Sequence, residues 1–175
     1  MIRKAVLQDI GQVAEGYREI LLHEQEHGAY TVWKLGVYPT RKTAEESLER
    51  GALYVMEQEG EIWASMIVDR AQPEEYGRIK WNYPAGPDEI LVLHLLCVRP
   101  SKAGRGIGGD MVRFVLEEGR RLGCKAVRLD TGEQNKPAVS LYKKLGFELA
   151  GTADMAIGGV IAHKNHLFFE KSTAK

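Results

Sequence analysis

The sequence lacks the long apolar stretches that mark membrane and secreted proteins. No apolar run reaches the roughly 18 residues that a membrane-spanning helix needs. The N-terminal residues, Met1–Lys4, lack the apolar region of a signal peptide. We therefore expect a protein of the cytoplasm that does not enter a membrane.

Cysteine is also scarce, with two residues, Cys97 and Cys124, in a chain of 175. Two thiols among apolar or helix-end neighbours predict reduced cysteines and not a disulfide framework. Repeats, low-complexity tracts and linkers are absent, and the length suits one hydrophobic core. We expect a single domain over residues 1–175.

Excess charge of either sign is missing, since 24 Lys and Arg balance 24 Asp and Glu. The balance is uneven along the chain: residues 1–98 carry 10 basic against 16 acidic side chains, and residues 99–144 carry 11 against 5. The basic middle suits a phosphorylated ligand and the acidic front a cationic one. Solvated faces with chance asymmetry are the alternative. We expect no nucleic-acid partner.

Glycine is concentrated in one place, residues 104–109, between an apolar run that Pro100 interrupts and a helix-periodic segment. The pattern predicts a strand, a loop and a helix N-terminus. A loop with so little side-chain bulk lets an anion approach the backbone. The free N–H groups and the positive end of the helix dipole then bind it. The stretch predicts a pyrophosphate site.

Apolar periodicity predicts the other elements. Strands are expected at residues 2–6, 52–57, 61–69, 89–98, 125–130, 147–150 and 166–170. Helices are expected from Asp9 to Gly28, over residues 43–51, from the glycine loop to Gly123, and over residues 135–144. Residues 71–88 form a long loop, with a further short strand near residues 79–81. Hairpin strands followed by alternating strands and helices predict a mixed α/β sheet.

Two phosphate-binding motifs are excluded by what surrounds the glycines. Gly104, Gly106 and Gly109 match the spacing of the dinucleotide fingerprint, and Asp130 follows at a strand end. Five residues separate Val98 from Gly104, however, and the 66 residues after Gly109 are too few for a doubly wound sheet. A P-loop fails because Asp110, and not lysine, follows Gly109.

The segment from His23 to His27 matches the H-E-x-x-H zinc motif, which places two histidines one helical turn apart. Its interior residues are charged or polar, Gly28 ends the helix at once, and no third ligand is evident. An exposed helix end accounts for the same residues. We therefore predict no metal.

Two further motifs carry a resemblance. The first is Val98-Arg99-Pro100 followed by Gly104-Arg105-Gly106-Ile107-Gly108, and the second is Asn135-x-x-Ala138-x-x-Leu141-Tyr142-x-x-x-Gly146-Phe147. Together, about 30 residues apart, they resemble the GNAT family of acyl-CoA-dependent N-acetyltransferases, over roughly residues 89–150. Ala103 departs from the pattern, which usually has Gln or Arg there.

The resemblance implies a mostly antiparallel, twisted mixed sheet of about six to seven strands with helices on both faces. It implies transfer of an acetyl group from acetyl-CoA, the co-substrate, to a primary amine by direct attack. The backbone amides of the loop would bind the coenzyme A pyrophosphate. These belong to Gly104, Arg105, Gly106, Ile107, Gly108 and Gly109. Leu96 and Val98 would pair with the pantetheine arm through their backbone groups.

Catalytic residues follow from the same resemblance. Tyr142 matches the tyrosine that protonates the departing thiolate, and its alternative is a partly buried aromatic residue of a helix. Asn135 would help to hold the cofactor or would only cap a helix. For the base we choose His94, because histidine has a suitable pKa. His94 alternates with Leu96 and would share its face of the strand. A hydrogen-bonded core histidine, or a water relaying to Glu89 or to an acid of the first helix, is the alternative.

The acceptor pocket of such proteins lies largely between the first two helices, here within residues 23–40. Glu24, Tyr30 and Trp33 would bind an ammonium group through charge and cation–π contact. The alternative is surface acids around a local aromatic cluster. A small-molecule amine is the expected acceptor, and a peptide or protein amine is the second choice. A coenzyme A sensor without turnover is the competing function, and the sequence leaves a homodimer open.

Overall fold

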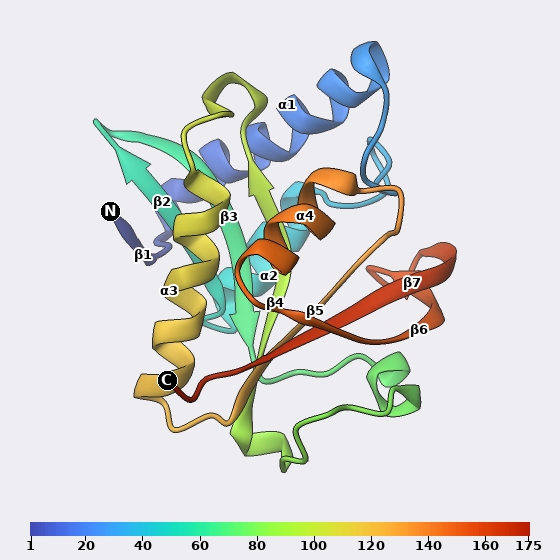
Figure 1. Ribbon diagram of the computed structural model, residues 1–175. Coiled ribbons are helices and arrows are strands. Elements are labelled where there is room, and N and C mark those ends of the chain that lie inside the picture. Colours follow the sequence, from blue (N-terminus) through green and yellow to red (C-terminus); the bar gives the residue numbers. More distant parts are fainter.

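The computed structural model describes all 175 residues as one seven-stranded sheet with helices on both faces (Figure 1). The strands are β1 (Ile2–Lys4), β2 (Leu53–Gln58), β3 (Glu61–Asp69), β4 (Ile90–Val98), β5 (Ala126–Thr131), β6 (Glu148–Ile157) and β7 (Ile161–Ser172). The helices are α1 (Ile10–His27), α2 (Arg41–Glu49), α3 (Ile107–Arg121) and α4 (Lys136–Lys144).

The strand order is β1-β2-β3-β4-β5-β7-β6. Every neighbouring pair is antiparallel except β4 and β5, which run parallel and are connected through α3. A parallel pair needs such a crossover, whereas the antiparallel pairs β2–β3 and β6–β7 need only a short turn. The predicted mixed, mostly antiparallel sheet is confirmed.

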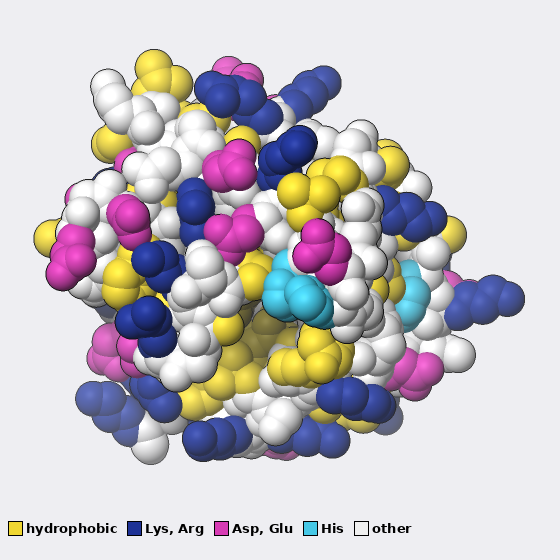
Figure 2. All heavy atoms as spheres, turned by 90° about the horizontal axis from the view of Figure 1, so that it is seen from above, with side chains coloured by type: hydrophobic (Ala, Val, Ile, Leu, Met, Phe, Trp, Pro, Cys, Tyr) yellow, Lys and Arg dark blue, Asp and Glu magenta, His cyan; other side chains and the backbone are white.

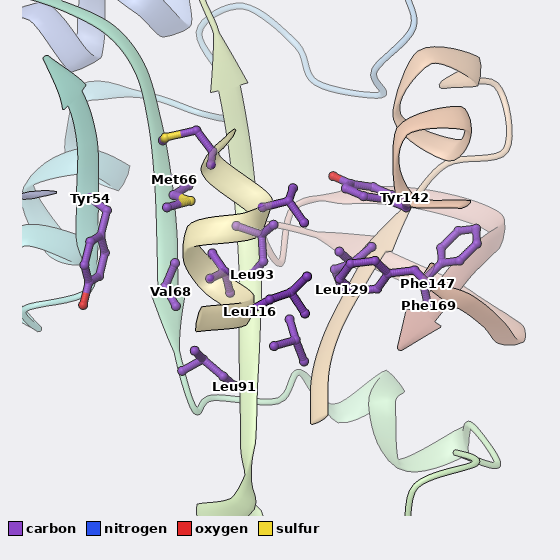
Figure 3. Close-up of a cluster of buried hydrophobic side chains, with 14 of the residues drawn as sticks. Tyr54, Met66, Val68, Leu91, Leu93, Leu116, Leu129, Tyr142, Phe147 and Phe169 are labelled. Carbon is purple, nitrogen blue, oxygen red and sulfur yellow. The ribbon is translucent and has the colours of Figure 1, made fainter. Parts of the chain in front are cut away.

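Alternating side chains divide the core into layers. On one face, Val55, Ile67 and Cys97 pack against α1 and α2. On the other, neighbouring strand positions such as Leu91 and Leu93 pack against α3 and α4. Figure 3 shows this second layer, in which Leu116 of α3 faces Leu91 and Leu93 of β4. The helices on both faces follow from this period-two burial.

Two predicted elements differ from the structure. No strand forms at residues 79–81, which belong to a long covering segment, residues 70–89, that crosses one face of the sheet. The apolar side chain of Ile79 packs on that face of the sheet and not within a strand. Trp81 donates a hydrogen bond to the carbonyl oxygen of Tyr76. Strands β6 and β7 extend well beyond the predicted stretches because they form one long hairpin.

A bulge in β4 separates the C-terminal ends of β4 and β5. β4 pairs with β5 only as far as Leu93, opposite Leu129. Its register with β3 then shifts between His94 and Cys97, and Leu95 adopts a positive φ of 48°. A bulge inserts an extra residue and bends its strand. The two parallel strands therefore diverge, as Figure 1 shows, and leave an opening between them.

Candidate functional site

A cavity of about 550 Å³, here called the central cleft, occupies the opening between β4 and β5. Residues of β4, β5, α1, α3, α4 and the loops at this end of the sheet line it. They include Leu93, Leu96, Val98, Gly108, Asn135, Ala138, Leu141 and Tyr142. Figure 2 looks down on this end of the molecule and shows a hollow with hydrophobic side chains on its floor. Half of the lining residues are apolar, which suits an organic ligand.

The glycine loop borders the cleft as predicted. Gly104 and Gly106 both have positive φ angles, 78° and 74°, which glycine adopts without strain. Gly106 is the N-cap of α3 and offers no side-chain oxygen, so the first N–H groups of the helix have no side-chain partner. A Cβ at Gly108 would stand 3.2 Å from Leu141. Bare amides at a positive dipole end make a cradle that fits a diphosphate.

The free edge of β4 lies beside the cleft. Leu96 and Val98 line the cleft, and no residue of β4 after Leu93 pairs with β5. Their β5-facing backbone groups can therefore pair with an extended ligand as an added strand would. The structure thus brings these two predicted residues together with the glycine loop.

Tyr142 projects from α4 into the cleft, with its hydroxyl directed toward β4 (Figure 3). The residue is buried, and the hydroxyl makes no hydrogen bond to another protein group. Burial, and secondarily the charge of Asp130, raise the pKa of Tyr142 above its ordinary value. The phenol therefore keeps its proton at neutral pH.

A second cavity of about 510 Å³, here called the side cavity, adjoins the central cleft. The two cavities share seven lining residues: Thr31, Trp33, Leu93, Leu95, Asp130, Thr131 and Asn135. Asn135 also caps α4, since its side chain accepts a 3.3 Å hydrogen bond from the Ala138 N–H. Both predicted roles of Asn135 are thus compatible.

His94 lines the side cavity but not the central cleft. The prediction that His94 and Leu96 share one face of the strand is wrong, because the bulge at Leu95 breaks the alternation between them. Nε2 of His94 lies 2.9 Å from Oδ1 of Asp69. Because the carboxylate accepts this hydrogen bond, Nε2 carries a proton, and the neutral ring would then hold its lone pair on Nδ1.

The pKa of the Asp69 carboxyl depends on its burial and on the groups around it. Burial has the largest single effect and raises its pKa. The hydrogen bond and charge of His94, the Ala71 N–H and the charge of Arg50 together lower it by more, so that the pKa lies below its ordinary value. Asp69 therefore stays ionised at neutral pH and fixes the orientation of the His94 ring.

The three predicted acceptor residues are placed differently. Trp33 lines both cavities. Tyr30 is largely exposed and lies on the central cleft alone. The Glu24 carboxylate accepts hydrogen bonds from the Tyr30 N–H, the Thr31 N–H and the Thr31 hydroxyl at 2.7, 2.8 and 2.5 Å. Glu24 thus closes the loop after α1 and also lines the central cleft, and its contact with an ammonium group stays a prediction.

A buried polar network was missed by sequence reasoning. Asp130 accepts hydrogen bonds from the Tyr76 hydroxyl at 2.9 Å and from Nε2 of His166 at 3.0 Å. Nδ1 of His166 in turn lies 3.0 Å from Nδ1 of His163. The network joins three segments that are distant in sequence and share no motif: Tyr76, Asp130, and the pair His163 and His166 of β7. Only the position of Asp130 at the end of a predicted strand signalled a role.

The segment that matches the zinc motif lies at the C-terminal end of α1. The rings of His23 and His27 lie 4.4 Å apart at the end of α1, and no cluster of three or more metal-ligating side chains occurs in the structure.

None of the helices combines the length and the apolar character needed to cross a bilayer.

Comparison with known proteins agrees with this geometry. The model of the acetyltransferase (GNAT) family matches residues 17–147. The uncharacterised N-acetyltransferase YesJ of Bacillus subtilis is 30% identical over 130 residues, 74% of this chain and 66% of that protein. Thialysine N-epsilon-acetyltransferase of Bos taurus is 34% identical over 71 residues, 41% of this chain and 42% of that protein. An uncharacterised N-acetyltransferase of Methanocaldococcus jannaschii matches over 26% of its own length. The chain thus spans between about a quarter and two thirds of these curated relatives.

Solved structures show the same fold. A GNAT-family acetyltransferase from Streptococcus agalactiae superposes with a TM-score of 0.83 at 21% identity, covering 100% of this chain and 96% of that one. The acetyltransferase yncA of Salmonella typhimurium, solved with its cofactor acetyl-CoA, gives a TM-score of 0.69 at 17% identity, covering 100% and 94%. The predicted GNAT-like fold is confirmed, and this chain belongs to the GNAT family of acetyltransferases.

Proposed function

We propose that the protein transfers the acetyl group of acetyl-CoA to a primary amine of a small molecule by direct attack. One observation carries this proposal: the central cleft and the side cavity share a wall between β4 and β5. A donor in the cleft and an acceptor in the cavity would meet there, next to His94 on one side and Tyr142 on the other.

The central cleft fits coenzyme A. The bare amides from Gly106 to Gly109 suit the pyrophosphate, and the unpaired edge at Leu96 and Val98 suits the amide-containing pantetheine arm. Arg105, exposed on the loop, adds positive charge beside the phosphates. Ala103 removes a side chain that many members of the family have, but the backbone amides remain.

Acetyl-CoA would supply an acetyl thioester, and the protein would supply proton transfers and position. Near neutral pH, only about one alkylamine in a thousand is unprotonated, at a pKa near 10.4. Without help this shortage adds roughly 4 kcal/mol to the barrier. Nδ1 of His94 would take the proton from the nitrogen, with the ring oriented by Asp69.

The exchange balances in bonds and protons. The amine nitrogen forms a bond to the acetyl carbon, and the carbon–sulfur bond breaks with its electron pair on sulfur. Starting from the ammonium form, the nitrogen loses two protons: the first passes through His94 to solvent before the attack, and the second passes to His94 as the amide forms. The thiolate takes a proton from the Tyr142 hydroxyl, which has no hydrogen-bond acceptor in the protein. Transfer of the His94 proton back to the tyrosinate through solvent restores both side chains.

Two observations favour a small acceptor. The side cavity, at about 510 Å³, is of the size that small ligands occupy. The partial relatives named thialysine N-epsilon-acetyltransferase carry in that name an amino group of a small molecule. A peptide or protein amine remains the second candidate, and a coenzyme A sensor without turnover the third.

The test is thiol release from acetyl-CoA with polyamines, amino acids, aminoglycosides and peptides. We expect release with at least one small amine, together with coenzyme A binding by calorimetry. Binding without release across the panel would favour the sensor, and release with peptides alone would favour the peptide acceptor. Absence of both binding and release would overturn the proposal.

A further inference from the structure

We propose that Asp130 is the carboxylate that binds the ammonium group of the acceptor, with Tyr76 and His166 as its positioning residues. The inference deepens the proposed function and rests on it. It names a residue for recognition of the cationic form of the acceptor, before His94 removes the proton.

The location of Asp130 is the first argument. No Lys or Arg lines either cavity, and Asp130 is the one carboxylate that lines both. It belongs to β5, on the opposite side of the opening from His94 of β4. An ammonium group bound to Asp130 would therefore lie at the wall where the side cavity meets the cleft.

The other carboxylates nearby are unsuitable. All hydrogen bonds of Glu24 go to the loop after α1. Glu75 accepts a hydrogen bond from the Ala156 N–H at 3.0 Å, and Glu74 is exposed at the rim of the side cavity. Their charge attracts a cation toward the cavity, but neither of them reaches the shared wall.

The contacts of Asp130 fix its position and leave its charge available. The Tyr76 hydroxyl donates to Oδ2 and His166 donates to Oδ1, one hydrogen bond to each oxygen. A carboxylate can accept about four hydrogen bonds, so Asp130 can accept one from a further donor. At a pH where both imidazoles are neutral, His163 donates to His166 and His166 donates to Asp130. No Lys or Arg forms a salt bridge with the carboxylate.

A largely buried carboxylate that forms no salt bridge with Lys or Arg favours a cationic ligand. The Asp130 side chain is 15% exposed and His166 only 4%. A charge so far removed from water is costly unless it is paired. Trp33 and Tyr38, which line the side cavity, add aromatic faces suited to a cation.

The test compares two probes of similar shape on Asp130→Asn, at about pH 8, where ordinary imidazoles are neutral. Benzylamine is protonated there, and O-benzylhydroxylamine carries a neutral primary amino group. Binding of each is measured by calorimetry on protein saturated with coenzyme A, which permits no turnover. Kinetics with acetyl-CoA follow as a second readout.

We expect Asp130→Asn to weaken benzylamine binding by about tenfold or more and O-benzylhydroxylamine binding by less than about twofold. The KM for the protonated amine should rise more than kcat falls. Asp88→Asn, which removes an exposed carboxylate without a side-chain partner, should change neither probe. Equal losses for both probes, no loss, or no binding of benzylamine to the unaltered protein would overturn the inference.

Tyr76→Phe keeps the test usable if Asp130→Asn does not fold. It removes one hydrogen bond and retains the carboxylate, so we expect a smaller loss, about threefold, again confined to benzylamine. Equal effects on both probes would indicate a purely structural network. Because binding is measured without turnover, a failure of acetyl transfer and a failure of ammonium recognition give different results.

Discussion

Three ionisable side chains have roles in the proposed reaction: Tyr142 lines the central cleft, His94 lines the side cavity, and Asp130 lines both. Each is held by a different element, respectively α4, β4 and β5. Burial keeps the phenol protonated, Asp69 orients the imidazole, and Tyr76 and His166 hold the carboxylate. In the proposed mechanism, these different environments would make Tyr142 the proton donor, His94 the proton acceptor and Asp130 the anion that binds the ammonium group.

Replacing Tyr142 by Phe should lower kcat about 100-fold, because the thiolate then loses its proton donor. The affinity for coenzyme A should change little, since the ring remains. Steady-state kinetics and calorimetry measure the two quantities. Tyr83→Phe is the matched control, since Tyr83 hydrogen bonds to Glu148 at the surface. An unchanged kcat for Tyr142→Phe would remove the catalytic assignment.

Cys97 provides a check on direct attack. It is in β4 near the site but packs on the α1 face, and burial raises its pKa to about 12. An acetyl-cysteine intermediate would need a thiolate. Cys97→Ala should therefore keep kcat within about threefold while losing about 1 kcal/mol of stability. Loss of acetyl transfer in a folded Cys97→Ala protein would contradict direct attack.

The Asp69–His94 pair predicts a defined pH dependence of stability. Because the pKa of Asp69 is lower in the folded protein than in the unfolded chain, the pair stabilises the fold above the unfolded value, near 3.9. That contribution is lost as the pH falls through the folded pKa. Asp69→Asn should cost about 1 kcal/mol at neutral pH and progressively less in acid. Urea unfolding at several pH values measures this, and a constant difference would exclude the explanation.

At the scale of the element, the covering segment of residues 70–89 is anchored by a buried charge pair. Arg128 and Glu170 are both buried, with Nε and Oε2 3.6 Å apart. The Arg128 guanidinium lies 4.2 Å over the Trp81 ring and donates to Gln72 and Tyr83. Tyr76, which belongs to the same segment, holds Asp130. The segment that this charge pair anchors therefore also positions Asp130, which lines both cavities.

Arg128→Leu should destabilise the protein by about 3 kcal/mol, because it leaves Glu170 buried without a cation. The double variant with Glu170→Leu should recover much of this loss, since the uncompensated charge is gone. Denaturant unfolding of the two single variants and the double variant measures the coupling. Additive losses would show that the two side chains act independently.

At the scale of the whole molecule, the bulge in β4 creates the opening, and the glycine loop borders it. Ligand binding at this edge should stabilise the entire domain, because the cleft joins both helical layers of the sheet. Coenzyme A at 100 times its Kd adds about 2.7 kcal/mol. For a domain of this size, that corresponds to a rise in Tm of about 5–10 °C.

Gly106→Val should abolish this rise in Tm, because a β-branched residue does not accommodate the positive φ that shapes the cradle. Gly60→Val is the matched control: Gly60 has φ 81°, lies in open space in the β2–β3 turn, and is remote from the cleft. It should lower Tm yet retain the response to coenzyme A. No response in the unaltered protein would contradict the pyrophosphate assignment.

The sequence by itself determined what depends on neighbours along the chain. Local periodicity placed all seven strands and four helices, and the glycines at 104 and 106 marked a loop that only residues tolerant of positive φ can form. Helix capping by Asn135 was readable for the same reason. These features arise from the backbone and the nearest side chains.

Tertiary structure alone decided which side chains meet. The bulge at Leu95 moved His94 off the face of Leu96, because strand register depends on the partner strand and not on the sequence pattern. Glu24 accepts backbone hydrogen bonds because the chain after α1 folds back over it. The network of Tyr76, Asp130 and His166 joins three distant segments, which only the assembled sheet and its covering segment bring within hydrogen-bond distance.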